Sequence, residues 1–246
     1  MPKQRVDQLL VERGLAESRA KAQALVMAGL VFSGEKRIDK PGAALAAEAP
    51  LSVKGKPHPW VSRGGVKLAH ALEHFGIDPA GQVCLDVGAS TGGFTEVLLA
   101  KGAAKVYAVD VGHGQLDWKL REDKRVAVLE RTNARHLTRE LIPEAVDLVV
   151  CDASFIGLRT VLPAPLALTK PAAALVALVK PQFEAGPGQV GKGGIVRDDA
   201  VRAEVCETIS AWLAAQRGWR VLGIVPSPIE GADGNKEFLI AARKSN

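Results

Sequence analysis

The chain has 246 residues, 47% of them hydrophobic, and a formal net charge of +5. This length allows one large domain or a small domain beside a medium one, with enough apolar residues for a sizeable core. No window approaches the roughly 18 uninterrupted apolar residues of a membrane span, and residues 1–7 lack the apolar core of a signal peptide, so we expect a cytoplasmic protein that does not enter membranes.

Residues 1–60 predict a small, basic α+β module. They hold ten Lys/Arg and six Asp/Glu, a net charge of +4 that leaves only +1 for the rest of the chain. A basic module attached to a nearly neutral body indicates a polyanionic partner, although a lysine-rich solvated surface gives the same charge pattern. The apolar spacing and the turn residues predict two helices and three short strands, over 5–13, 17–29, 30–32, 37–39 and 51–53.

This module resembles the small RNA-binding motif of ribosomal protein S4, which is also called the alpha-L motif. The resemblance rests on residues 5–10, 18–22 and 28–31. It implies sequence-tolerant contacts to RNA phosphates, whose binding weakens as salt rises. The candidate RNA-binding residues in this module are Arg5, Arg19, Lys21, Lys36 and Arg37.

The pattern changes after a stretch rich in proline and glycine. Two prolines and a glycine in residues 54–59 interrupt both helix and sheet, so we predict domains over 1–56 and 63–246 with a linker over 57–62. Apolar strand-like runs then alternate with helical patterns, which is typical of a Rossmann-like α/β fold with a mostly parallel, seven-stranded sheet and an antiparallel edge. The predicted strands are 82–87, 105–109, 126–130, 146–151, 174–179, 219–225 and 237–242, and the helices are 64–75, 92–101, 115–121, 157–168 and 197–216. The glycine-rich residues 185–194 are long enough to form a mobile loop.

A glycine-rich turn joins the first of these strands to the next helix and predicts a nucleotide site. The dinucleotide fingerprint G-x-G-x-x-G fails because Ser90 stands where its second glycine should be. The form Asp-x-Gly-x-x-x-Gly-Gly is instead seen in methyltransferases that use S-adenosylmethionine, whereas a purely structural turn is the alternative. The cofactor-binding candidates in this turn are Asp86, Gly88, Ala89, Ser90, Thr91, Gly92, Gly93 and Phe94. Asp110 ends the next strand, where a carboxylate can accept both ribose hydroxyls, and Asn133 is a candidate for the adenine edge.

Four charged residues at element ends form a candidate catalytic set. Lys67 begins a helix, Asp152 and Lys180 end strands, and Glu237 opens the last strand. Enzymes of this fold that methylate base amino groups carry two prolines at the position after this aspartate, where they shape a floor for a planar base. Asp152 is not followed by such prolines, and their absence favours an oxygen nucleophile. A ribose hydroxyl needs a nearby base, and a lysine whose pKa is lowered by a second lysine can serve. We assign the base to Lys180 and the steering of the hydroxyl to Lys67, with the two carboxylates as orienters, although each charge alone is commonly a solvated strand end.

The whole chain resembles the TlyA (haemolysin A) family, in which an alpha-L domain precedes an FtsJ-like ribose methyltransferase. The matching motifs are residues 62–68, 86–94, 152–156, 180–184 and 234–238. The resemblance implies 2′-O-methylation of cytidine in ribosomal RNA of the small subunit, the large subunit, or both, with S-adenosylmethionine as cofactor. Asp152 would then also approach the cofactor, Arg63 would contact RNA, and Phe155 would stack on an unstacked target base.

Several other features of the sequence bear on this interpretation. Residues 70–74 match the H-x-x-E-H zinc pattern, but no third ligand motif follows, so no metal is predicted. Three cysteines without metal-type spacing predict reduced, buried thiols. A membrane-active haemolysin and a non-catalytic ribosome assembly factor remain alternative functions, and the oligomeric state is open. Surface charge is the default for four further basic residues that could touch RNA, namely Arg131, Arg135, Arg139 and Lys192.

Overall fold

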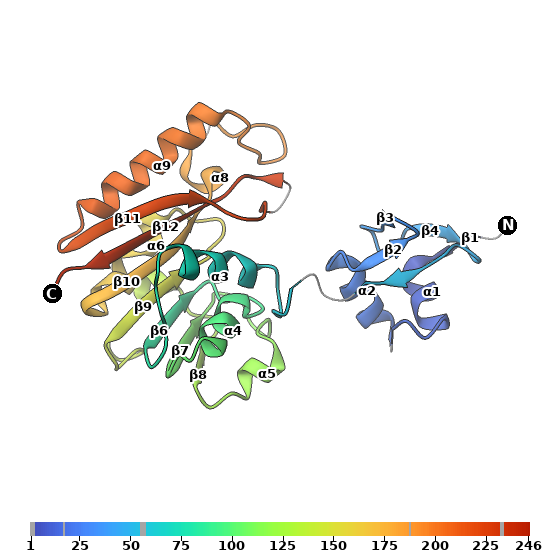
Figure 1. Ribbon diagram of the computed structural model, residues 1–246, viewed down its shortest axis with the longest axis horizontal. Coiled ribbons are helices and arrows are strands. Elements are labelled where there is room, and N and C mark those ends of the chain that lie inside the picture. Colours follow the sequence, from blue (N-terminus) through green and yellow to red (C-terminus); the bar gives the residue numbers. More distant parts are fainter. Residues whose placement is uncertain (1–2, 17, 55–57, 187, 232–233) are drawn as a thin grey trace. The chain divides into compact units, whose positions relative to one another are not determined.

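The computed structural model describes residues 3–16, 18–54, 58–186, 188–231 and 234–246. The chain divides into two compact units, residues 1–59 and 60–246 (Figure 1). Residues 55–57, which include the end of the predicted first domain and the first residue of the predicted linker, lie outside the described residues. Residues 60–62, also assigned to the linker from the sequence, belong to the second unit, where the Val61 N–H donates to the Glu96 carboxylate.

The first unit packs two helices against two small sheets. Helix α1 (Val6–Glu12) and helix α2 (Arg19–Met27) bury Val6, Leu10 and Val26 in a core of their own. Strands β2 (Val31–Ser33), β3 (Lys36–Arg37) and β5 (Ser52–Val53) form a sheet in the order β3-β2-β5. The sequence did not indicate the second sheet, an antiparallel pair of β1 (Lys3–Arg5) and β4 (Ala44–Ala46), because three-residue strands are too short to show an alternating pattern.

The second unit is built on a seven-stranded sheet in the order β11-β12-β10-β9-β6-β7-β8. Five neighbouring strands are parallel, and β12 runs antiparallel to both β10 and β11, which confirms the predicted mostly parallel sheet with an antiparallel edge. The strands are β6 (Val83–Val87), β7 (Lys105–Val109), β8 (Val126–Leu129), β9 (Val146–Cys151), β10 (Thr169–Val179), β11 (Trp219–Pro226) and β12 (Phe238–Lys244).

Helices cover both faces of this sheet, as Figure 1 shows. Side chains that alternate along each buried strand enter two separate cores, so that Val149 and Cys151 face one layer while Leu148 and Val150 face the other. The first layer contains α6 (Leu158–Val161), α7 (Pro163–Ala167) and α9 (Asp199–Ala214), beside the 3-10 helix η1 (Ala134–His136). The second contains α3 (Gly64–His74), α4 (Gly93–Ala100) and α5 (Trp118–Arg121).

Two helices differ from the predicted ones for local reasons. The single helix expected over 157–168 is divided into α6 and α7, because Pro163 lacks the N–H that a continuous helix needs and occupies the first position of α7. The helix expected over 115–121 begins only at Trp118, after Asp117 caps it by accepting the Lys119 N–H. One further short helix, α8 (Pro181–Glu184), follows Lys180.

Candidate active site

The chain reverses its direction of winding between β6 and β9, the two central strands of the sheet. Strands β7 and β8 lie on one side of β6, whereas β9 and β10 lie on the other. Loops that leave neighbouring carboxyl ends at such a reversal move apart and leave a crevice, which is where open α/β sheets bind ligands. A cleft of about 580 Å³ lies at this position, lined by residues that follow β6, β9 and β10.

The glycine-rich turn after β6 forms one wall of the cleft. Gly88 has a φ of +83°, and a Cβ there would lie 2.9 Å from the backbone of Ala153, so the close approach of the β9 end requires glycine. Gly92 has a φ of +97°, and a Cβ there would overlap Leu120. The turn then enters α4, whose first N–H groups have no partner within the helix. Of the predicted turn residues, those lining the cleft are Gly88, Ala89, Ser90, Thr91, Gly93 and Phe94.

Asp86 supports this turn from beneath and does not line the cleft. Its carboxylate is fully buried, and its Oδ2 accepts a hydrogen bond from the Thr95 hydroxyl at 2.7 Å. Burial raises the pKa of Asp86 from its ordinary value of 3.8 to about 7. Its other oxygen, Oδ1, has no hydrogen-bond partner among the described residues.

The raised pKa of Asp86 predicts a pH dependence of stability. The folded chain holds this proton more tightly than the unfolded chain between about pH 4 and about pH 7, so the free energy of unfolding falls as pH rises through that window. Asp86→Asn should remove up to about 4 kcal/mol of this fall. Denaturant titrations at the two ends of the window measure it, and Asp78→Asn, which alters an exposed carboxylate, is the control. Equal pH dependence in Asp86→Asn and the parent chain would contradict the assignment.

Asp110 and Asn133 do not line the cleft, and the side chains of both accept hydrogen bonds from backbone N–H groups. The Asp110 carboxylate accepts the Ser90 N–H at 2.8 Å and the Gly112 N–H at 2.7 Å, so it ties the glycine-rich turn to the end of β7. Asn133 caps η1 by accepting the Arg135 N–H at 3.1 Å. A carboxylate accepts up to four hydrogen bonds, so Asp110 keeps capacity for a ribose.

The four charged residues meet in the cleft as two ion pairs. The Nζ of Lys67 on α3 lies 2.5 Å from Oε2 of Glu237, the residue before β12. Lys67 is only 5% exposed and Glu237 only 4%. The Nζ of Lys180 lies 2.6 Å from the carboxylate of Asp152, and these residues follow the neighbouring strands β10 and β9. All four line the cleft together with the glycine-rich turn. Each lysine is therefore paired with a carboxylate.

The ammonium of Lys180 has two further partners that the sequence did not indicate. Its Nζ donates to the Ser154 hydroxyl at 2.9 Å and to the Asp152 backbone carbonyl at 3.2 Å. These two hydrogen bonds fix the position of the ammonium beside the Asp152 carboxylate. Ser154 was visible in the sequence as part of Asp152-Ala153-Ser154-Phe155, but its role depends on the approach of β10.

Asn235 is a second lining residue that was missed. It is buried, its side-chain oxygen accepts the Val196 N–H at 3.2 Å, and its amide donates to the Gly194 carbonyl at 3.0 Å. These bonds hold the end of the glycine-rich 185–194 segment beside Glu237, so Gly193 and Gly194 also line the cleft.

Phe155 stands at the mouth of the cleft in an unusual conformation. Its side chain is 91% exposed, its φ is +63°, and its ring centroid lies 5.2 Å from that of Phe183. A left-handed φ is costly for a bulky residue and concentrates at ligand sites. The segment that follows Phe155 is held by Glu184, whose carboxylate accepts the Leu158 N–H at 2.6 Å.

The predicted RNA-binding cations take different positions. Arg63 precedes α3 and lines the cleft in the second unit. In the first unit Lys21 and Lys36 are exposed, and Arg37 pairs with Asp39 at 2.6 Å. Arg5 and Arg19 both bind the carboxylate of Asp7.

Other signals have structural explanations. His70 and His74 share a face of α3 with ring centroids 6.1 Å apart, and no described group of three or more His, Cys, Asp or Glu residues is placed to hold a metal ion. The three cysteines are buried and free of disulfides, as predicted, and burial raises the pKa of Cys84 and Cys151 to about 12. In the part of the chain that the structure describes, no helix is long and apolar enough to span a membrane.

Comparisons with known proteins agree with this architecture. The model of FtsJ-like methyltransferases matches residues 60–244, and the S4 domain model matches residues 4–49. The 16S/23S rRNA (cytidine-2′-O)-methyltransferase TlyA of Mycobacterium tuberculosis is 52% identical over 97% of this chain and 89% of its own length. Hemolysin A of Brachyspira hyodysenteriae is 39% identical over 96% of this chain and 98% of its own. A solved hemolysin structure from Streptococcus thermophilus covers 100% of this chain and 90% of its own, at a TM-score of 0.78 and 44% identity.

Proposed function

Because the chain belongs to the TlyA (haemolysin A) family of FtsJ-like methyltransferases, we propose that it methylates a cytidine ribose 2′-hydroxyl of ribosomal RNA, using S-adenosylmethionine. The observation that carries this function is the meeting of two lysine–carboxylate pairs with a glycine-rich turn in one cleft. The substrate is rRNA, free or in ribosomal subunits, which places the activity in the cytoplasm.

The residues present fit the cofactor. A Cβ at Gly88 would fill the space beside the Ala153 backbone, and the start of α4, which has no side-chain cap, suits a carboxylate. S-adenosylmethionine supplies an electrophilic methyl group when it is bound. The turn residues and Asp110 would hold it, Asn133 would be available to the adenine, and Asp152 would approach it from the side of Lys180.

The chain's own residues then prepare the attacking oxygen. After its ammonium group releases a proton to solvent, the neutral amine of Lys180 accepts the hydroxyl proton, and Asp152 and Ser154 fix the direction of its Nζ. Lys67 steers the hydroxyl and Glu237 orients Lys67 within a desolvated pair. Holding the oxygen in line with the methyl group makes the transfer effectively unimolecular, and positioning supplies much of the rate.

Mapping of ribose methyl groups tests this function. Purified protein, S-adenosylmethionine and rRNA or ribosomal subunits from cells that lack the enzyme should yield a new 2′-O-methylcytidine, which mass spectrometry of nuclease fragments locates. Methylation of bases alone, or none, would contradict the proposal. Lysis of red cells that persists without cofactor would instead support the haemolysin function, a name that appears among the similar proteins.

Phe155 offers a separate test of RNA recognition. Its exposed, strained position beside Phe183 supports a role as a stacking surface for the target base, and stacking of a base on an aromatic side chain contributes about 1–3 kcal/mol. Phe155→Ala should therefore lower kcat/KM for rRNA by about 10- to 100-fold and leave cofactor affinity unchanged. Leu141→Ala, which truncates another partly exposed apolar side chain, is the control. An unchanged kcat/KM would remove Phe155 from the RNA site.

A further inference from the structure

A buried carboxylate lies beneath two arginines of the first unit. Asp7 is 0% exposed, and the other buried polar or charged side chains among the described residues all belong to the second unit. A charge is buried at large cost unless it is paired and hydrogen-bonded. We therefore expect the buried charge of Asp7 to hold other groups in place.

Three side chains converge on this carboxylate. Arg5 binds it in a bidentate manner, with Nε 3.0 Å from Oδ1 and Nη2 2.9 Å from Oδ2. The Nε of Arg19 donates to Oδ2 at 3.1 Å, and Gln23 donates to the same oxygen at 3.0 Å. The Arg5 guanidinium and the other donors hold the pKa of Asp7 well below its usual range, so the carboxylate stays charged.

These residues come from the starts of two packed helices. Arg5 immediately precedes α1 and Asp7 lies in the first turn of this helix. Arg19 is the first residue of α2, and Gln23 follows one turn later. Arg5 also lies against Gly42, where a Cβ would be only 3.1 Å from Nη1. The cluster is therefore a fixed part of the fold of this unit.

The guanidinium groups remain available to a ligand. The Arg5 and Arg19 side chains are 45% and 54% exposed although the carboxylate between them is buried. Nη1 of Arg5 and both Nη atoms of Arg19 donate to no described residue. Because Nη2 of Arg5 and Nε of Arg19 contact the same oxygen at 2.9 and 3.1 Å, these nitrogens are no more than about 6 Å apart.

We propose that Asp7 is a positioning residue that holds Arg5 and Arg19 as one phosphate-binding pair for the RNA backbone. Two guanidinium groups repel each other, and a shared carboxylate offsets that repulsion while it fixes their planes. Planar forks of free N–H groups suit the oxygens of a phosphate. The inference rests on the proposed action on rRNA, because it names the contacts by which the first unit would bind that substrate.

Substitution of Asp7 by Asn separates positioning from charge. Asp7→Asn removes one negative charge from a basic unit, so charge alone predicts tighter RNA binding. Positioning predicts weaker binding, because the Asn amide would face the arginine donors and the guanidinium groups would lose their common anchor. In the full-length chain we expect affinity for deproteinised rRNA to fall about tenfold, and the slope of log affinity against log salt to decrease by about 1–2.

A double-mutant cycle distinguishes positioning from loss of fold. In an Arg5→Gln/Arg19→Gln background, Asp7→Asn should leave rRNA affinity unchanged, because no arginines remain to be placed. An equal loss in both backgrounds would mean that the unit is merely unfolded and would overturn the inference. So would unchanged or tighter rRNA binding by Asp7→Asn in the parent chain.

The remaining outcomes separate this inference from the proposed function. Unchanged rRNA binding by Arg5→Gln/Arg19→Gln would remove these arginines, and Asp7 with them, from the RNA site. Methyl transfer by the parent chain, measured at saturating rRNA, would remain intact in that case. Cofactor affinity, a property of the second unit, should be the same in all four proteins of the cycle.

Discussion

Lys180→Met should reduce the single-turnover rate of methyl transfer by about 10³-fold and leave S-adenosylmethionine affinity within about twofold of the parent chain. The substitution removes the amine that we assign as base and keeps a side chain of similar length. Asp152, Ser154 and the glycine-rich turn remain in place, so the cofactor site should persist. Rapid quench with a methyl-labelled cofactor measures the rate, and calorimetry measures the affinity.

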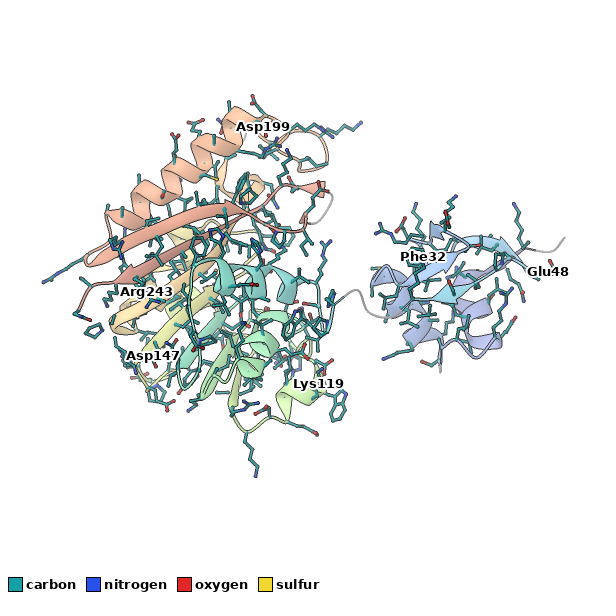
Figure 2. All side chains as sticks on the ribbon, in the orientation of Figure 1. Phe32, Glu48, Lys119, Asp147, Asp199 and Arg243 are labelled. Atoms are coloured by element: carbon teal, nitrogen blue, oxygen red, sulfur yellow. The ribbon has the colours of Figure 1, made fainter. Side chains whose placement is uncertain are left out.

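Two companion variants make this result specific. Lys180→Arg keeps a positive charge but cannot lose a proton near neutral pH, so it should be nearly as inactive as Lys180→Met if Lys180 is a base. Substantial turnover in Lys180→Arg would show that only the charge matters. Lys170→Met is the matched control, because Lys170 lies near the start of the same strand and pairs with Asp147 at 2.6 Å. Asp147, labelled in Figure 2, lies at the amino end of β9, whereas the cleft is at its carboxyl end.

Much of the second unit could be predicted because its signals are local. Central strands such as β9 are buried on both faces and therefore contain apolar runs such as residues 148–151. The carboxyl ends of parallel strands share one edge, so the order of elements alone brought the turn after β6 near Asp152. The backbone contact of Gly88 with Ala153 is the physical form of that proximity.

Contacts between distant residues could not be predicted in the same way. The sequence indicated two lysines and two carboxylates but not which lysine pairs with which carboxylate. The pairing of Lys67 with Glu237, 170 positions apart, depends on how α3 packs beside the reversed strand β12. Ser154 and Asn235 were missed for the same reason, because a hydroxyl or an amide carries no periodic signal and gains its role only from neighbours.

In the first unit the net charge could be predicted from composition, whereas the arrangement of the charged groups could not. Ten basic residues indicated a polyanionic partner, and Asp7 was counted only as one opposing charge. In the fold, that carboxylate is the centre of the arginine cluster. Net charge reports how strongly a surface attracts RNA, whereas a buried counter-charge decides where the attracting groups point.

Loss of the buried Lys67–Glu237 pair should lower both the free energy of unfolding and the rate of methyl transfer. Two variants distinguish the two effects. Glu237→Gln leaves the Lys67 ammonium almost fully buried without its counter-charge, which costs about 3–5 kcal/mol for a pair of this kind. We expect the free energy of unfolding to fall by about that amount, and methyl transfer to fall at least about 100-fold because Lys67 loses its orientation. Lys105→Met, which breaks the more exposed Lys105–Glu144 pair, should change stability by less than about 1 kcal/mol.

Replacement of both charges should then restore the fold without the function. In Lys67→Met/Glu237→Leu no buried charge remains, and apolar side chains of similar volume often stabilise as well as the ion pair they replace. The double variant should therefore recover most of the lost free energy of unfolding while methyl transfer stays as low as in Glu237→Gln. Recovery of both would show that the pair serves only the fold. Recovery of stability alone would assign its charges to the reaction, since a buried ion pair that an apolar pair can replace is not needed for folding.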